Sequence, residues 1–112
     1  MQFGEDVSHM IRYDKETGTL TVSTGEELDQ LMAEKIRNTI DSEILKTGAK
    51  KLVFDMTNTV FMDSSGIGML IGRYKLMKRM NGRVAVKGMH ENVMRIFRMS
   101  GLNQIINYEE RA

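Results

Sequence analysis

The order of apolar patterns along this chain predicts an α/β fold, with one mixed sheet of about five strands and about three to four helices packed on it. Two short β-prone runs come first, separated by a polar loop, and helix-like and strand-like segments then alternate. Such alternation is typical of parallel strands joined by helical crossovers, whereas the opening pair suits a hairpin. The 112 residues match the length of one domain, so we expect a single domain over residues 1–112.

The first half of the chain contains the predicted hairpin, a helix and a strand. Residues 9–13 and 19–23 are the hairpin strands, joined by the loop DKETG. Apolar residues then recur at every fourth position, which predicts a helix with Asp29 as its N-cap and Gly48 as its end. These positions are Met32, Ile36, Ile40 and Ile44. Residues 51–56 read KLVFDM, a pattern that indicates a buried strand.

A second helix is predicted after the loop at residues 57–62, where the segment DSSG leads into a helical apolar stripe. The stripe consists of Ile67, Leu70, Ile71, Tyr74 and Met77. The pair Asn81 and Gly82 is expected to end this helix. Gly68 and Gly72 lie on one helical face, which predicts close packing against a neighbouring element.

The remaining segments complete the predicted sheet. RVAVK at residues 83–87 indicates a strand, and residues 91–100 indicate a third helix with Gly101 as a left-handed cap. The inward positions of that helix are Val93, Ile96 and Phe97. We expect QIINY, at residues 104–108, to close the sheet.

Composition excludes several classes of function. The chain has no cysteine, and its two histidines, His9 and His90, leave little for a metal site, so no metal or cofactor is expected. No apolar run approaches the roughly 20 residues of a membrane helix, and the N-terminal MQFGEDVSHM lacks the pattern of a secretory signal. We therefore expect a cytoplasmic protein that does not insert into membranes.

Charge is distributed unevenly, with acids predominant in residues 1–34 and bases predominant in residues 73–98. Such a distribution suits either the solvated outer faces of helices or the steering of a charged partner. Tyr74 and Phe97 in the basic region belong to apolar stripes, so no stacking platform for bases is left. Direct nucleic-acid binding is not expected.

The helix start at DSSG is the most informative position. Asp63, Ser64 and Ser65 are all suited to capping a helix, which is the structural explanation for any one of them. A helix start also favours negative charge, because free N–H groups and the helix dipole point outward there. A phosphate on a serine would therefore be accommodated at this turn.

Two enzymatic interpretations are weaker. Gly66, Gly68 and Gly72 form GxGxxxG, which departs from the dinucleotide fingerprint, and no GK[ST] motif is present. A serine hydrolase would need GxSxG and a positioned base, for which only His90 offers a candidate near the motif. We do not expect an enzyme.

The segments FMDSSGIGMLIGRYK, NGRVAV and RIFRMSGL closely resemble the anti-sigma factor antagonists of the STAS domain family, and the sporulation-type antagonists most of all. The similarity runs from Glu27 to Leu102. It implies a mixed sheet with packed helices and a partner-switching cycle. The unphosphorylated antagonist binds an anti-sigma factor serine kinase and frees a sigma factor, the kinase then phosphorylates the antagonist, and a serine phosphatase reverses the modification.

The resemblance also implies roles for individual residues. Ser64 is the phosphoacceptor, Asp63 is its acidic neighbour, and Ser65 and Gly66 complete the turn. The ELD segment ending at Asp29 resembles the family's GELD, which contributes to the partner surface, although its glycine here stands one residue earlier. The chain also stops soon after the last predicted strand, which leaves little room for the family's usual C-terminal helix.

We further hypothesise that Met69, Arg73 and Leu76 form a partly exposed stripe that contacts the kinase, because Met and Arg are common at interfaces. Core packing is the competing explanation for this stripe. Two other functions stay open: a STAS module that acts as a scaffold or transport accessory protein, and a nucleotide-binding or hydrolytic enzyme.

Overall fold

The computed structural model describes residues 7–109 of the chain, so most of the N-terminal segment interpreted above lies outside the described residues. The strands are β1 (Ile11–Asp14), β2 (Thr19–Ser23), β3 (Glu27–Leu28), β4 (Lys51–Asp55), β5 (Phe61–Met62), β6 (Arg83–Lys87) and β7 (Asn107–Glu109). The helices are α1 (Gln30–Thr47), α2 (Ser64–Arg79) and α3 (Glu91–Met99), with short 3-10 turns η1 (Ser8–Met10) and η2 (Leu102–Gln104). The α/β class predicted from the sequence is confirmed.

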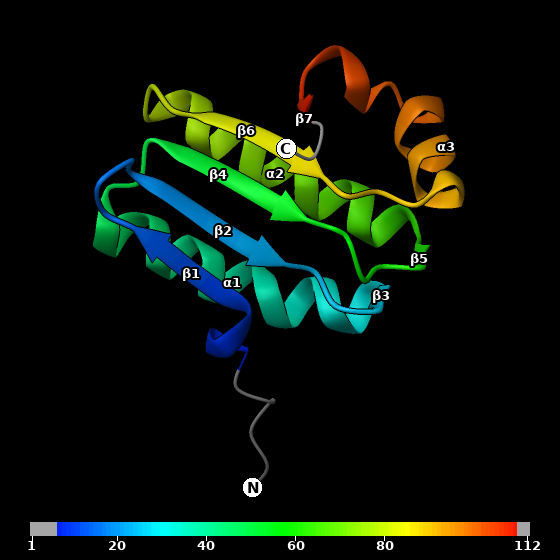
Figure 1. The fold of residues 1–112 in the computed structure, drawn as a ribbon, viewed down its shortest axis with the longest axis horizontal. Helices are drawn as coiled ribbons and strands as arrows, with labels where there is room; N and C mark the ends of the chain where they lie inside the picture. The colour runs from blue at the N-terminus through cyan, green and yellow to red at the C-terminus, as the bar shows by residue number, and fades with distance from the viewer. Residues whose placement is uncertain (1–6, 110–112) are drawn as a thin grey trace, which may run out of the picture.

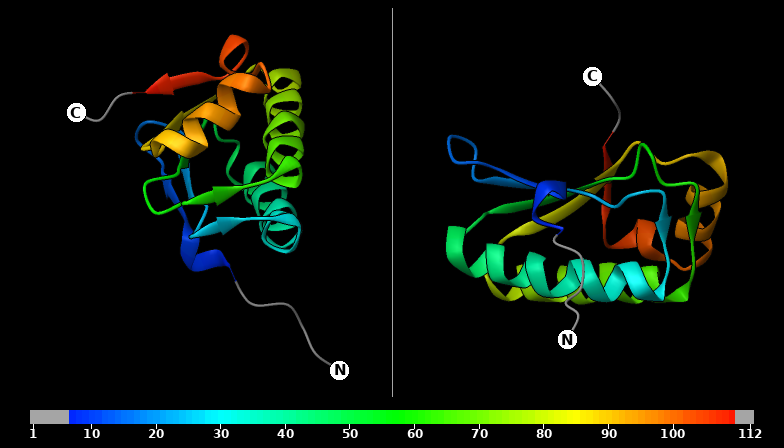
Figure 2. Two further views of the ribbon diagram at one scale, coloured as in Figure 1. Left: turned by 90° about the vertical axis from the view of Figure 1, so that its right-hand side faces the viewer. Right: turned by 90° about the horizontal axis from the view of Figure 1, so that it is seen from below.

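Five strands form the main sheet in the order β1-β2-β4-β6-β7. The β1–β2 pair is antiparallel, and every other neighbouring pair in this sheet is parallel. Helices α1 and α2 lie side by side on one face of the sheet. Both begin at the end of the molecule where the parallel strands have their carboxyl ends (Figures 1 and 2). Helix α3 lies at that same end of the molecule, beside β5 (Figure 2).

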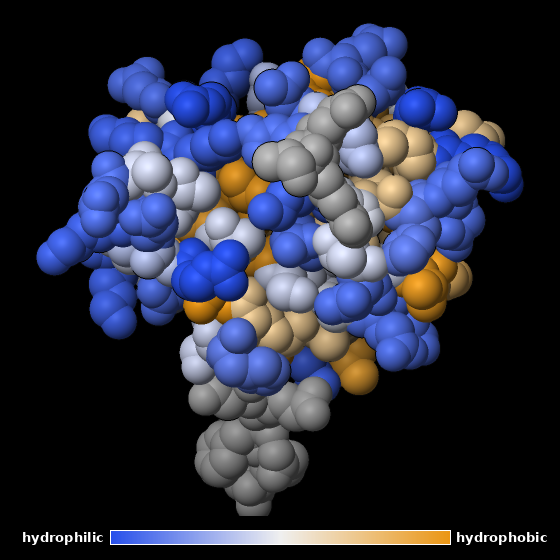
Figure 3. All heavy atoms as spheres, in the orientation of Figure 1, coloured by the Kyte–Doolittle hydropathy of each residue, from blue (hydrophilic) through white to orange (hydrophobic). Residues whose placement is uncertain are grey.

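Burial alternates along β2 and separates the two faces of the sheet there. Leu20, Val22 and Phe54 are fully buried with the apolar faces of the helices. The alternate positions of β2 are Thr19, Thr21 and Ser23, all only partly buried. Figure 3 shows the sheet side that the helices leave open, and hydrophilic residues cover most of it. In β4 and β6 the alternate residues Val53 and Ala85 are buried as well, so only β2 shows the alternation of a strand with one solvated face.

The predicted helix boundaries agree closely with the structure. The Asp29 carboxylate accepts a hydrogen bond from the Met32 amide at 3.0 Å, and Gly48 ends α1 with a φ of 67°. Gly101 adopts the left-handed conformation after α3, also as expected. The last strand is shifted, because residues 102–104 form a 3-10 turn that delays β7 until Asn107.

A two-stranded sheet was not predicted from the sequence. Strands β3 and β5 pair in parallel, with Glu27 opposite Phe61 and Leu28 opposite Met62. Part of the segment expected to be a loop, residues 57–62, is therefore strand. Two residues are too few to show any periodicity, so only the tertiary structure reveals this pair.

The glycines of α2 do not pack as expected. A methyl group built on Gly68 or Gly72 would meet no atom within 4 Å, so neither glycine is needed for close packing and that prediction is wrong. The close approach occurs at Gly66, where such a methyl would lie 2.8 Å from the Leu28 carbonyl oxygen and 2.7 Å from the Met62 side chain. The reason is that the first turn of α2 rests on the β3–β5 pair, whereas Gly68 and Gly72 face an open groove.

Candidate functional site

The β3–β5 pair brings the starts of α1 and α2 together. Its register ends with Leu28 opposite Met62, and the next residue on each strand, Asp29 and Asp63, is the N-cap of a helix. Both helices therefore direct their free N–H groups toward the same end of the molecule (Figure 1). Aligned helix starts of this kind make a surface suited to an added negative charge.

Ser64 is the first residue of α2 and its side chain is exposed. The cap is made by Asp63 alone, whose Oδ1 accepts hydrogen bonds from the amides of Ser65 at 2.9 Å and Gly66 at 3.3 Å. Within residues 7–109, no hydrogen bond is formed by the Ser64 hydroxyl. Of the three candidate caps in the sequence, one does the capping, and the Ser64 hydroxyl is left accessible to an incoming reagent.

Ser65 and Gly66 follow Ser64 in the first turn of α2. Gly66 is buried and closely approached by Leu28 and Met62, so its missing side chain lets the first turn of α2 lie directly on β3. Ser65 is half-buried and lines a groove between α1 and α2. The close contact at Gly66 thus fixes where the first turn of α2, and with it Ser64, lies on β3.

An acidic hollow lies beside the two caps. It is lined by Asp29, Gln30, Leu31, Glu34 and Asp63. Leu31, in this hollow, is 61% exposed, and the neighbouring strand β5 and its approach expose Val60 and Phe61 by 51% and 46%. Exposed large apolar side chains near an accessible serine are typical of a protein-binding surface rather than of a catalytic pocket.

Hydrogen bonds connect the segment before β5, residues 57–60, to the start of α3. The Nε2 atom of His90 donates to the Thr57 carbonyl oxygen at 2.7 Å, since a carbonyl can only accept, and the Asn92 side-chain amide donates to the Val60 carbonyl oxygen at 2.7 Å. Among the described residues, no histidine is hydrogen-bonded to Ser64. His90 therefore acts as a structural clamp here, and the hydrolase alternative gains no support from its position.

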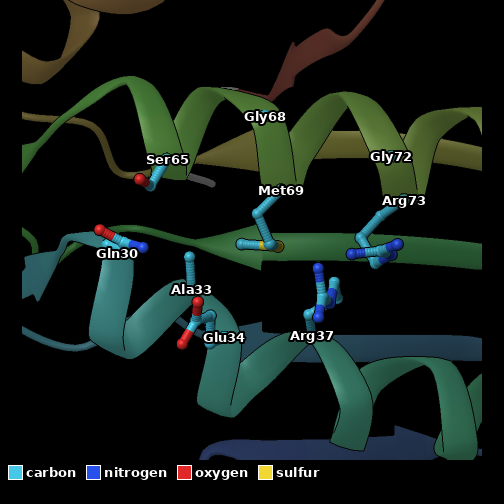
Figure 4. Close-up of a pocket in the computed structure, with 9 residues that line it drawn as sticks. All are labelled: Gln30, Ala33, Glu34, Arg37, Ser65, Gly68, Met69, Gly72 and Arg73. Atoms are coloured by element: carbon cyan, nitrogen blue, oxygen red, sulfur yellow. The ribbon is translucent and has the colours of Figure 1, made fainter.

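The hypothesis that Met69 and Arg73 are partly exposed is wrong. Met69 is 4% exposed and Arg73 is 9% exposed, and both side chains point from α2 toward α1 (Figure 4). The physical reason is that α1 lies beside α2, so the helix has two packed faces, one on the sheet and one on α1. Leu76 is partly buried against the core. Core packing therefore explains this stripe.

Arg73 forms an ion pair within the helix layer. Its Nε atom lies 2.8 Å from Asp41 Oδ1, but the N–H does not point at the oxygen, so the contact lacks the geometry of a hydrogen bond. Burial lowers the pKa of the Arg73 guanidinium, Asp41 opposes that shift, and the positive charge of Arg37 adds to it. Burial is the largest of these three effects.

Two negative findings concern residues 7–109. No helix there is long and apolar enough to cross a membrane. Nor do three or more acidic or imidazole side chains gather there in a way that could hold a metal ion.

Comparison with known proteins identifies the class. Residues 10–111 match the STAS domain, and the chain belongs to the STAS domain family. It is 35% identical to the anti-sigma F factor antagonist of Paenibacillus polymyxa, across 86% of this chain and 82% of that protein. The family resemblance stated from the sequence motifs is confirmed.

Two further relatives extend this similarity. The anti-sigma-B factor antagonist of Listeria monocytogenes is 26% identical over 83% of this chain and 81% of that protein. Among solved structures, the Bacillus cell fate determinant SpoIIAA in its phosphorylated form is 25% identical with a TM-score of 0.69, across 86% of this chain and 85% of that one. The relatives are thus anti-sigma factor antagonists of both the F and the B type.

The exposed apolar side chains near Ser64, those of Leu31, Val60 and Phe61, were not predicted from the sequence. Leu31 occupies a polar stretch of α1, and Val60 and Phe61 stand in a segment interpreted as a loop. Consecutive apolar residues in a polar loop were the one available signal, because such residues are either buried or used for binding. Only the structure shows that they stay exposed beside Ser64.

Proposed function

We propose that this protein is an anti-sigma factor antagonist whose binding is switched by phosphorylation of Ser64. In its unphosphorylated form it binds an anti-sigma factor serine kinase in the cytoplasm and so releases the sigma factor. The kinase phosphorylates Ser64 to end the interaction, and a serine phosphatase restores it. The protein is a substrate and ligand in this cycle and not an enzyme.

The observation that carries this proposal is the exposed hydroxyl of Ser64, which forms no hydrogen bond within residues 7–109 and lies at the start of α2 beside the start of α1. A phosphate there would gain about 0.3–1 kcal/mol from the helix dipole, which offsets part of its repulsion by Asp63 and Asp29. The fold can therefore tolerate the modification. The apolar side chains of Leu31, Val60 and Phe61 provide the area that a partner would cover.

The switch is proposed to act by charge at the interface. A phosphate covered by a partner without compensation costs about 2–5 kcal/mol, which corresponds to roughly 30-fold to several thousand-fold in affinity. Asp29, Glu34 and Asp63 beside Ser64 already make the local surface negative, and a phosphate would add to that charge. No rearrangement of the fold is required.

The test is a phosphorylation assay with candidate kinases. The protein is incubated with ATP and an anti-sigma factor kinase of the F type or the B type, and the modified residue is located by mass spectrometry. We expect one phosphate at Ser64, none in Ser64→Ala, and normal transfer in Ser65→Ala as the matched control. Phosphate on Ser64→Ala would overturn the assignment.

A binding measurement tests the mechanism separately. We expect Ser64→Glu to bind the kinase at least about 30-fold more weakly while its unfolding midpoint in urea stays close to that of the unmodified protein. Full binding by Ser64→Glu would contradict the electrostatic switch. ATP turnover by the protein alone would favour the enzymatic alternative, and folded, stable protein that binds neither kinase would favour a scaffold or transport accessory role.

A further inference from the structure

We infer that the groove between α1 and α2 is a binding site for a small ligand with an oxyanion group, held by Arg37 and Arg73. This inference does not depend on phosphorylation of Ser64. The α1–α2 groove has a volume of about 390 Å³ and is open because its walls carry small residues. These are Ala33 on α1 and Gly68 and Gly72 on α2.

Arg73 has donors that the protein does not satisfy. The side chain is about nine-tenths buried, yet among the described residues none accepts a hydrogen bond from its Nε or Nη1. Asp41 approaches Nε as an ion but lies outside hydrogen-bond geometry. Nε thus has the Asp41 charge beside it, whereas Nη1 has no partner among the described residues. Since buried donors are nearly always paired in folded proteins, Nη1 indicates an acceptor that is not part of the chain.

Arg37 supplies the second positive charge. Its side chain points from α1 toward Arg73 across the groove, so two guanidinium groups face each other (Figure 4). The repulsion between them is one reason why the pKa of Arg73 is lowered. An anion between the two groups would remove that repulsion and supply acceptors to both, and planar guanidinium groups bind carboxylate and phosphate oxygens in pairs.

The other residues of the groove determine where the oxyanion lies and what kind of ligand fits. Glu34, which also lines it, lies about one turn earlier on α1, toward Ser65, so the oxyanion belongs at the arginine end. Next to the arginines, toward Ser65, the open space over Gly68 and Gly72 has room for the uncharged body of a small molecule. The class of ligand is therefore a phosphate monoester or a carboxylic acid of low molecular weight, or the free oxyanion.

Nuclear magnetic resonance of the whole chain labelled with nitrogen-15 tests the site directly. The protein is titrated at constant ionic strength with inorganic phosphate, glycerol phosphate and acetate, with sodium chloride as the reference salt. We expect saturable shifts of the Arg73 side-chain N–H and the Gly72 amide. Tighter binding of glycerol phosphate than of inorganic phosphate assigns the site to esters, equal binding assigns it to the free oxyanion, and preference for acetate assigns it to carboxylic acids.

Two variants make the result decisive. Arg37→Gln should weaken binding about tenfold or more, whereas Arg95→Gln on α3 removes the same charge elsewhere and should leave it unchanged. Gly72→Leu keeps every charge but fills the groove, and it should also weaken binding of glycerol phosphate about tenfold. Shifts that chloride reproduces, or that survive Arg37→Gln, or that the two arginine variants reduce equally, would overturn the inference.

Discussion

At the scale of single residues, the three glycines near the start of α2 differ because their neighbours differ. Gly66 is in contact with β3 and β5, whereas Gly68 faces open space on the same helix. Nothing in the motif DSSGIG distinguishes these two glycines. The surroundings therefore decide which glycine is required and which one merely weakens the helix.

Substitution of these glycines should change stability in opposite directions. Gly66→Ala places a methyl 2.8 Å from the Leu28 carbonyl oxygen, and we expect it to lower the free energy of unfolding by about 1–3 kcal/mol. Gly68→Ala adds a methyl in open space and removes backbone entropy from the unfolded chain, so it should raise the free energy by about 0.5–1 kcal/mol. Urea unfolding measures both, and equal effects of the two substitutions would contradict the packing described for Gly66.

The Asp63 carboxylate can be tested in the same way. Asp63→Ala removes the acceptor for two amides at the start of α2 and should cost about 1–2 kcal/mol of stability. Asp63→Asn keeps an acceptor oxygen and should cost clearly less. If both variants unfold at the same urea concentration, the negative charge matters more than the cap hydrogen bonds.

At the scale of elements, the α1–α2 contact determines what the second face of α2 does. The sequence of α2 alone shows one apolar stripe for the sheet and leaves open whether the second stripe, with Met69 and Arg73, is partly exposed or packed. The parallel crossovers place α1 alongside, and this stripe becomes buried. A helix in a layer has two packed faces, and its own residues do not reveal the neighbour.

The ion pair between these helices should respond unequally to removal of its two partners. Asp41→Ala leaves the buried Arg73 guanidinium without its counter-charge and should cost about 1–2 kcal/mol, less than for a fully buried pair because Asp41 is about one-third exposed. Arg73→Met replaces the charge with a side chain of similar length and should stay within about 1 kcal/mol of the unmodified protein. Thermal or urea unfolding measures the stability of both variants. A larger loss of stability for Arg73→Met than for Asp41→Ala would show that the arginine itself stabilises the packing of the two helices.

At the scale of the whole molecule, the sheet has a protected centre and two unequal edges. Strands β2, β4 and β6 each have a neighbour on both sides, whereas β1 and the short β7 form the edges. The site lies at the end of the molecule where β3, β5 and the helix starts meet, away from the centre of the sheet (Figure 2). Partner binding and phosphorylation can thus occur at a periphery without disturbing the core.

Rates of amide hydrogen exchange should differ between the central strands and the edge strand β7. Amides of β4 and β6, such as those of Phe54 and Val86, are expected to exchange only through global unfolding, and amides of β7 at least about tenfold faster through local opening. Nuclear magnetic resonance under native conditions gives the individual rates. Equal protection of Val86 and Tyr108 would mean that β7 is an integral part of the cooperative core.

Elements with local signals could be predicted from the order of residues alone. Periodicity defined α1 through Ile36, Ile40 and Ile44, short oxygen-bearing side chains marked both helix starts, and the motif around Ser64 indicated the family. These features depend on contacts within one or two turns of chain, which the order of residues records directly.

Features that depend on distant segments became visible only in the folded molecule. The pairing of β3 with β5 unites Asp29 and Asp63, which are 34 positions apart in the sequence, and the packing of α1 on α2 buries Arg73 opposite Arg37. Ser64 stays exposed at the start of α2, and Leu31, Val60 and Phe61 are exposed at the same end of the molecule. Such contacts follow from the order of strands in the sheet, which no local pattern of residues specifies.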